Sequence, residues 1–457
     1  VNQKNNNKLK MIFVQSLGCV AFLMLYFALE AHTCPCQRKS DCEHPQTVPI
    51  YEDKKEVYVF SRGASNVQTW SWNTITALVV PEEFSVNNES HSSAMCVTHR
   101  NKRKFAITVS MNLSGEIDSV SNESKSWIDF VVSKQQSWYA DIVVVNLMPY
   151  FKSDVNSTKK DHQEMAIILK RVGTKIKDLS NYSAEINCII PWKPPCSEED
   201  DDHCDFSTLS TDGCEKYIIN PDSFTDVAGV KCRAKATIPL AKLLYGISEY
   251  VSHHISYSSI ILGIPWHGYD YLCTDIENDV CIIGKTNDCN VNRKMMSLAD
   301  LMSDPRKLMD EAKYSAIYAA PFYTNKNGSH QIWFENKLSL LGKYRVAHEM
   351  DLKGVAVMYG DDLSTKMSPN ALVNDEEVWS WLTHEIILSV SKEPIRADFH
   401  VADTVAAVAV SCLLVGTFLG TLFTCLALKK RVKKPRQPFA RDGGANVDEF
   451  LDEDPTL

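Results

Sequence analysis

The sequence predicts an α/β fold, a (β/α)8 TIM barrel with insertions, together with one C-terminal transmembrane helix. Two observations predict the barrel: short apolar runs rich in β-branched residues recur along the chain, and stretches of helical periodicity separate them. An uncharged apolar run near the C-terminus predicts the membrane helix. The expected strands are residues 56–61, 74–80, 104–110, 140–147, 184–191, 216–220, 259–265 and 354–359. The expected helices are residues 126–137, 163–179, 238–253 and 337–351.

The C-terminal apolar run covers residues 404–428 and, as a helix of about 37 Å, can cross a bilayer. A basic cluster, residues 429–436, follows it and places that side in the cytoplasm. We therefore expect a transmembrane helix within 401–428 and a cytoplasmic tail over 429–457. A lipid-anchor signal is the alternative, but such a signal ends in its apolar tail, whereas this chain continues with charged residues. Gly416 and Gly420 form a GxxxG pair that could support a homodimer.

The N-terminal apolar run, residues 12–29, follows three lysines and ends near the small residue Ala31. This layout is typical of a secretory signal peptide, which we place at residues 1–31. The chain opens with Val1, so Met11, directly before the apolar run, is a candidate start residue. An uncleaved signal anchor is the alternative interpretation.

Fifteen cysteines are present, of which twelve lie between Cys34 and Cys289. An even number in this span predicts disulfides in an oxidising compartment, and a zinc site is the rival interpretation. The acidic run 198–202 lies between two cysteines and reads as a solvated disulfide loop, with calcium binding as the alternative. Six sequons for N-glycosylation fall between the two apolar runs. They begin at Asn88, Asn112, Asn122, Asn156, Asn181 and Asn327.

These features together predict a single-pass type I membrane glycoprotein of the secretory pathway, in the cell-surface or endolysosomal membrane. Residues 32–400 would form its lumenal or extracellular domain. The net charge of −9 argues mildly against nucleic acid as a partner. The chain contains no recognisable phosphate loop or Ser-His-Asp set, and we expect neither a cofactor nor a metal.

Several local stretches carry a resemblance to a known family. They are CPCQRKSDC at 34–42, SSAMCVTHRNKRKFAITV at 92–109, IPWHGYDYLC at 264–273, APFYTNKNGSHQIWFENKLSLLGKY at 320–344 and LKGVAVMY at 352–359. In order and spacing they resemble the di-N-acetylchitobiases of glycoside hydrolase family 18. The resemblance covers most of residues 34–364. It implies a TIM barrel acting on N-acetylglucosamine oligosaccharides, in which the substrate's own N-acetyl group is the nucleophile.

The resemblance also implies a catalytic strand with the motif D-x-x-D-x-D-x-E, whose acids lie on one face because strand side chains alternate. The stretch YADIVVVNLMPY, residues 139–150, occupies this strand. The four motif positions carry Asp141, Val144, Asn146 and Met148, so only the first acid is kept. A thioether has no proton to donate, and Met148 therefore cannot act as the general acid.

Two further positions of the family pattern have changed. The sixth strand ends in Asn220-Pro221-Asp222 where the resemblance implies Tyr-Asp, and the last strand ends in Met358 and Tyr359 where it implies tryptophan. Aromatic residues near the strand ends could stack on sugar rings or pack the barrel. The sugar-binding candidates are Asp222, Trp266, Tyr269, Trp333, Met358 and Tyr359. Acids that could replace the lost one are Glu164, Asp154, Asp361 and Asp362.

We therefore expect a catalytically inactive pseudo-glycosidase that binds glycans containing N-acetylglucosamine or an unknown protein partner. A weakly active glycosidase using a displaced acid is one alternative. A structural interaction module is the other, with the pocket filled by Pro221 and Met358.

Overall fold

The computed structural model describes residues 34–43, 55–63, 66–85, 88–113, 117–151, 159–180, 182–195, 206–223, 232–284, 293–303, 311–363, 374–384 and 386. The proposed signal peptide, the transmembrane run with Gly416 and Gly420, the tail, Asn156, Asn181, Asp154 and the acidic run 198–202 lie outside these ranges. Of the helices in the described ranges, none combines the length and the apolar character that a membrane crossing needs.

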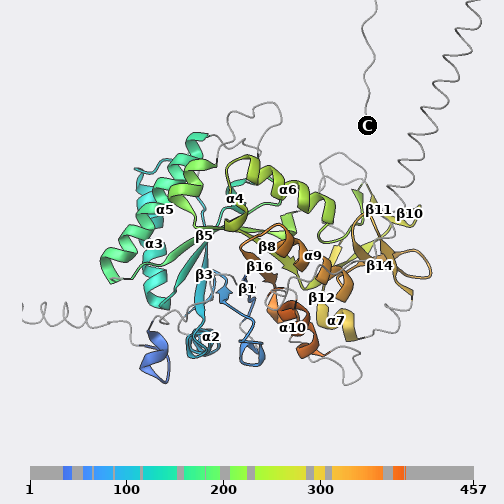
Figure 1. The fold of residues 1–457 in the computed structure, drawn as a ribbon, viewed down its shortest axis with the longest axis horizontal. Helices are drawn as coiled ribbons and strands as arrows, with labels where there is room; N and C mark the ends of the chain where they lie inside the picture. The colour runs from blue at the N-terminus through green and yellow to red at the C-terminus, as the bar shows by residue number, and fades with distance from the viewer. Residues whose placement is uncertain are drawn as a thin grey trace, which may run out of the picture. The chain divides into compact units, whose positions relative to one another are not determined.

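Eight parallel strands form a closed barrel, which confirms the predicted (β/α)8 barrel (Figure 1). All eight expected strands are present, and most end within one to three residues of the expected limits. Neighbouring strands pair around the ring in the order β1, β16, β8, β6, β5, β4, β3, β2. They are β1 (Glu56–Phe60), β2 (Ala77–Val80), β3 (Lys104–Ser110), β4 (Ile142–Asn146), β5 (Glu185–Ile190), β6 (Lys216–Ile219), β8 (Ile260–Pro265) and β16 (Gly354–Met358).

The continuous apolar runs of these strands arise because each strand is buried on both faces. In β4, Ile142 and Val144 belong to a cluster inside the barrel, whereas Val143 and Val145 belong to the larger core between barrel and helices. The residues of the inner cluster therefore alternate with those of the outer core along each strand, as strand geometry requires.

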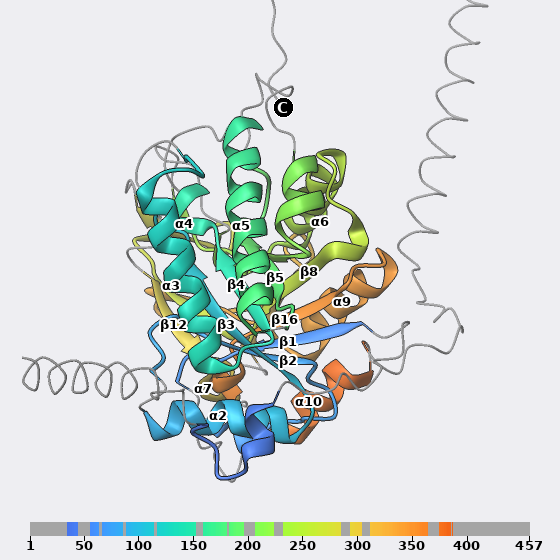
Figure 2. The same ribbon diagram turned by 90° about the vertical axis from the view of Figure 1, so that its left-hand side faces the viewer.

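Helices cover the outside of the barrel, and α3 and α5 lie side by side in both views (Figures 1 and 2). The α3 helix begins after Ser121, whose hydroxyl accepts the Ser124 N–H, and α9 begins with a capping box between Asn336 and Ser339. The longer helices are α2 (Glu89–Arg100), α3 (Asn122–Trp138), α5 (Lys159–Ser180), α6 (Leu240–Ser252), α9 (Lys337–Glu349) and α10 (Asp375–Thr383). Shorter ones are α4 (Met148–Phe151), α7 (Leu298–Ser303), η1 (Lys39–Cys42), η2 (Val67–Thr69), η4 (Leu209–Gly213), η5 (Pro221–Ser223), η6 (Tyr257–Ser259) and η7 (Gly360–Leu363).

An insertion between β8 and the last barrel strand builds an antiparallel sheet of five strands, ordered β12-β9-β15-β14-β13. These strands are β9 (His267–Leu272), β12 (Arg293–Ser297), β13 (Lys313–Ser315), β14 (Ala320–Thr324) and β15 (His330–Trp333). A smaller sheet joins β7 (Cys232–Arg233), β10 (Asp275–Glu277) and β11 (Val280–Gly284). Because β9 starts at His267, directly after the turn that leaves β8, the insertion brings residues of the 264–273 stretch to the barrel.

The expected disulfides are present in the described ranges. Pairs join Cys34 to Cys42, Cys36 to Cys96, Cys188 to Cys214, and Cys273 to Cys281, and Cys232 is also disulfide-bonded. The sulfurs of Cys34, Cys36 and Cys42 lie within 4.8 Å of one another, but their oxidation removes the thiolates that zinc needs. Four sequon residues fall in the described ranges, and all four are exposed: Asn88, Asn112, Asn122 and Asn327.

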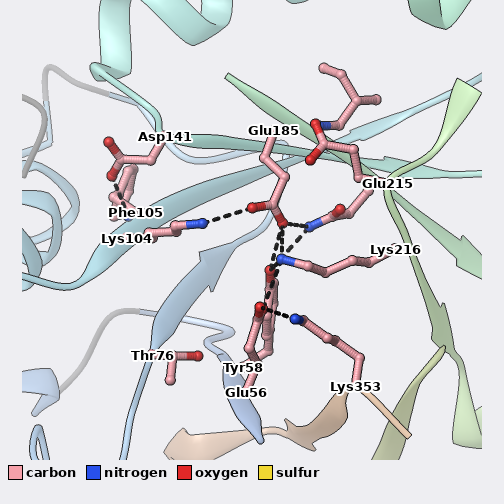
Figure 3. A network of polar contacts seen from close by, with 12 residues as sticks. Glu56, Tyr58, Thr76, Lys104, Phe105, Asp141, Glu185, Glu215, Lys216 and Lys353 are labelled. Carbon is pink, nitrogen blue, oxygen red and sulfur yellow. Dashed lines mark hydrogen bonds and ion pairs between the residues drawn. The ribbon is translucent and has the colours of Figure 1, made fainter. Parts of the chain in front are cut away.

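A network of charged side chains closes the amino end of the barrel (Figure 3). Glu185 lies at its centre, with Lys216 Nζ at 2.6 Å and Lys104 Nζ at 2.7 Å. Lys216 also bonds Glu56 at 2.9 Å, and the buried Tyr58 hydroxyl donates to Glu185 at 2.9 Å. Burial raises the pKa of Glu185, but Lys216 and Lys104 outweigh that effect and lower the pKa to about 2. Glu185 is therefore ionised at any physiological pH.

Candidate functional site

The carboxyl ends of the barrel strands surround a cavity of about 240 Å³. This is the end at which TIM barrels carry their active sites. The lining includes the apolar side chains of Phe60, Ile189 and Met358 and the polar side chains of Glu82, Glu83, Ser110, Asn146, Asn220 and Tyr359. The structure thus brings several of the residues singled out in the sequence, from β4, β6 and β16, to one small site.

The first two motif positions lie away from this cavity. Asp141 directly precedes β4, at the amino end of the barrel, and is buried. It accepts hydrogen bonds from the Phe105 N–H at 2.7 Å, from His99 Nε2 at 3.0 Å and from the Tyr182 hydroxyl at 3.2 Å. These bonds engage the retained acid in holding the amino end of the barrel together. Val144 is fully buried in the inner cluster.

The last two motif positions lie on the inner face of the barrel at its carboxyl end. Asn146 is half-buried and lines the cavity, and its Oδ1 accepts the Met148 N–H at 3.0 Å. The Met148 side chain is buried in the same inner cluster as Phe60 and Met358. Asn146 therefore presents an amide to the cavity, whereas Met148, the first residue of α4, places its thioether in the inner cluster and not in the cavity lining. Neither group is a general acid.

Asp222 is the centre of a hydrogen-bonded group beside the mouth. Its Oδ1 accepts from the Tyr269 hydroxyl at 2.8 Å and from His267 Nε2 at 3.2 Å. The other ring nitrogen of His267 lies 3.1 Å from the Met358 carbonyl oxygen and 3.4 Å from an Asp362 oxygen. The structure thus brings together two of the sugar-binding candidates, Asp222 and Tyr269, and His267 connects them to the backbone of a third, Met358.

The two carboxylates make His267 a cation at neutral pH. Burial lowers the pKa of His267, but hydrogen bonds and charge from Asp222 and Asp362 outweigh it and raise the pKa to about 8. Burial likewise raises the pKa of Asp222, but His267, Tyr269 and Arg293 bring it down to about 2. His267 and Asp222 therefore form a charge-assisted hydrogen bond over a wide pH range.

Two arginines stack on the aromatic rings that flank this group. The Arg62 guanidinium lies 4.0 Å from the centre of the Tyr359 ring, and the Arg293 guanidinium lies 4.0 Å from the centre of the Tyr269 ring. Arg62 also bonds Asp362 at 3.3 Å. Tyr359, which follows a cis peptide bond from Met358, is partly exposed toward the cavity. The stacked arginine therefore holds Tyr359 as an aromatic wall on which a sugar ring could lie.

Trp266 and Trp333 are packed in the protein interior, away from the cavity lining. Trp266 is fully buried, donates its Nε1–H to the Tyr344 hydroxyl at 3.0 Å and contacts the Trp379 ring edge-on at 4.8 Å. Trp333 stacks on Phe322 at 4.7 Å within the insertion. Their contacts match the packing role that the sequence left open for these aromatic residues.

The acids considered as substitutes have structural partners. Glu164 accepts the Ser119 N–H at 2.8 Å, and Asp361 accepts from the Ser61 hydroxyl at 3.2 Å and from the Arg62 N–H. Burial raises the pKa of Asp361. Asp362 bonds Arg62 and His267.

Sequence reasoning missed three functional candidates, Glu82, Glu83 and His267. The two glutamates lie two and three residues after the end of the second strand, so the rule that places strand carboxyl ends at the site could have found them.

No protein-family model matches the chain. Among characterised proteins, the di-N-acetylchitobiase of Mus musculus is 22% identical over 79% of this chain and 95% of its own length. The corresponding protein of Homo sapiens is 22% identical over 78% of this chain and 89% of its own. A probable di-N-acetylchitobiase of Dictyostelium discoideum is 24% identical over 79% and 92%.

The chain is similar in sequence, over most of their length, to the di-N-acetylchitobiases of glycoside hydrolase family 18. Solved structures support the fold of this chitobiase-like protein. A group IV chitinase of Ostrinia furnacalis, in complex with allosamidin, aligns over 74% of the chain with a TM-score of 0.56 and 12% identity. A class V chitinase mutant of Cycas revoluta, in complex with (GlcNAc)3, aligns over 72% with a TM-score of 0.55 and 10% identity. At such identities the structures establish the shared barrel alone.

Proposed function

We propose that the chitobiase-like domain is a pseudo-glycosidase that binds glycans containing N-acetylglucosamine at the barrel mouth without hydrolysing them. The observation that carries this proposal is the end of β4, where Asn146 lines the cavity and Met148 is buried in the inner cluster. Neither side chain can protonate a leaving oxygen. The sequence similarity to di-N-acetylchitobiases supports glycans containing N-acetylglucosamine as the ligand class.

The surroundings of the site support binding. Tyr359 offers a ring face stiffened by Arg62, and Asp222 presents a side chain that is about one-third exposed and fixed by His267 and Tyr269. A cavity of about 240 Å³ remains between Met358, Asn146 and their neighbours, which favours binding over a fully filled pocket. Preorganised polar groups of this kind give specificity in ligand sites.

The test uses the purified protein with chitobiose and chitotriose. We expect release of the reducing-end sugar to be slower than by an active chitobiase by a factor on the order of 10² to 10⁴ or more, because acid catalysis is missing. Calorimetric titration with chitotriose should nevertheless show binding. Release at a rate close to that of the active relative would contradict the proposal.

A weak glycosidase with a displaced acid is the second candidate function. The observation that favours it is the position of Glu82 and Glu83 in the cavity lining, because each carries a carboxyl group that could supply a proton there. Any residual hydrolysis should then disappear when both are changed to glutamine, while Glu164→Gln should leave it unchanged. Hydrolysis that survives the double change would exclude these two acids as the proton source.

We further propose that this domain faces the lumen or the cell exterior of a single-pass type I membrane protein. The disulfides and the exposure of Asn88, Asn112, Asn122 and Asn327 support it, together with the apolar run at 404–428. Mass shifts on glycosidase treatment and protection of the domain from protease in sealed microsomes would test this topology. A protein partner and a homodimer through Gly416 and Gly420 are parts of the same proposal, testable by cross-linking in membranes.

A further inference from the structure

Two polar side chains at or just beyond the ends of separate strands line the same cavity. Glu82 lies two residues beyond β2, and Asn146 is the last residue of β4. The strand between them is β3, whose last residue, Ser110, pairs in register with Asn146. The Ser110 N–H donates to Glu82 Oε2 at 2.8 Å. The Glu82 carboxylate is therefore held at the end of β3, one strand away from Asn146, and adjacent strands lie about 4.8 Å apart.

Each side chain has one polar atom engaged and one available. Asn146 Oδ1 accepts the Met148 N–H, which fixes the amide orientation because a backbone N–H requires an oxygen. Asn146 Nδ2 then remains a donor without a partner among the residues that the structure describes. Glu82 Oε2 accepts the Ser110 N–H. Glu82 Oε1 remains an acceptor with no partner among the described residues. Both side chains are half-buried and line the cavity.

We propose that Asn146 and Glu82 form a donor–acceptor pair that binds one polar group of the ligand, a group that can both accept and donate a hydrogen bond. In a sugar ligand such a group is an acetamido amide or a hydroxyl. The inference rests on the proposed function, which supplies the ligand class, and adds the two residues that select it. A carboxylate at position 146 could only accept, so the amide gives this cavity a donor at the strand end.

Isosteric variants test the pair without removing the backbone hydrogen bonds. Asn146→Asp keeps an oxygen for the Met148 N–H and replaces the donor by an acceptor. Glu82→Gln keeps an oxygen for the Ser110 N–H and removes the charge. Glu164→Gln is the matched control, because Glu164 also accepts a backbone N–H at 2.8 Å but lies outside the cavity lining. Thermal unfolding of all variants checks that the fold is retained.

Calorimetric titration of the full-length protein with chitotriose gives the result. Each single change at 146 or 82 should weaken binding about tenfold or more, since a bond to a charged or buried partner is lost, and Glu164→Gln should leave the Kd unchanged. The Kd of the double variant should rise by less than the product of the two single fold-increases, because both residues bind the same ligand group. The titration is repeated with the de-N-acetylated trimer. If the variants still raise the Kd for this trimer, the pair binds a hydroxyl group. If they no longer do so, the pair binds the acetamido group.

Three results would overturn the inference. Unchanged Kd values for both single variants, with normal wild-type binding, would exclude the pair while leaving the proposed function intact. Strictly multiplicative effects in the double variant would show that the residues bind separate groups. Absence of chitotriose binding by the wild-type protein would overturn the inference together with the proposed function.

Discussion

Nε2 of His267 lies 3.2 Å from Oδ1 of Asp222, and this contact ties the first strand of the insertion to the segment that follows β6. The imidazole is fully buried, so its charge depends on Asp222 and on Asp362 on its other side. A buried cation between two carboxylates links the stability of the barrel mouth to pH.

The pH dependence of stability should follow His267. Its pKa of about 8 in the folded protein lies above the ordinary value of 6.5, so its contribution is fully present below pH 6.5 and is lost as the pH rises through 8. The difference corresponds to roughly 2 kcal/mol. Urea unfolding of the wild type and of His267→Gln should therefore show a larger gap at pH 6 than at pH 9. Equal gaps at the two pH values would show that the pKa of His267 is the same in the folded and unfolded states, and would contradict the raised pKa.

A restored acid at position 148 should destabilise the protein. Met148 is buried beside Phe60 and Met358, so the carboxylate of Met148→Glu would lose hydration without a charged partner in the inner cluster. We expect a loss of about 1–3 kcal/mol at pH 7 that shrinks toward pH 4, because burial raises the pKa of such a carboxyl. Met148→Leu, the matched control, should cost less than about 1.5 kcal/mol at both pH values. A pH-independent loss for Met148→Glu would indicate a steric effect only.

Much of the barrel could be predicted because its strands are buried on both faces. The run 142–145 reads as a strand from its β-branched residues alone, and alternation places Asn146 on the face of Val144. Met148 reaches the same inner cluster from the start of α4. The 264–273 stretch, in contrast, could not be predicted from local pattern. Residue 266 sits between β8 and β9, so the tryptophan leaves the strand direction and packs on Trp379, a contact with a residue far along the chain.

The remaining features of the site depend on contacts between distant segments. His267 and Asp222 are 45 residues apart, and no spacing rule connects them. The pairing of Cys36 with Cys96, 60 residues away, is one of many that twelve cysteines allow. The sequence around Trp333 is equally ambiguous, because an aromatic residue fits either a sugar site or a core.

The charged network at the amino end of the barrel should tolerate acid but not the loss of Lys216. The Lys216 side chain is 10% exposed and forms ion pairs with both Glu185 and Glu56. Lys216→Met leaves Glu185 buried with Lys104 as its remaining ion-pair partner, and we expect a loss of about 3–5 kcal/mol in the free energy of unfolding. Lys353→Met is the control: Lys353 lies 3.5 Å from Glu56 with its side chain 37% exposed, so its loss should be below about 1 kcal/mol.

Acid titration gives a second measurement on the same network. Because the pKa of Glu185 is lowered to about 2, its contribution is present above the ordinary value of 4.5 and is lost as the pH falls through 2. The wild type should therefore keep this contribution at pH 5. The difference in the free energy of unfolding between the wild type and Lys216→Met should narrow below pH 4.5. A difference that stays constant down to pH 2 would contradict the lowered pKa of Glu185.

Removal of the Cys36–Cys96 disulfide should cost more stability than removal of Cys273–Cys281. The first closes a separation of 60 residues and the second a separation of 8. The chain-entropy estimate gives about 4 kcal/mol for the longer loop and about 2.5 kcal/mol for the shorter one. Urea unfolding of the two double-serine variants under non-reducing conditions measures both. A larger loss for Cys273–Cys281 would show that strain or packing in the insertion, and not loop entropy, decides what each disulfide contributes.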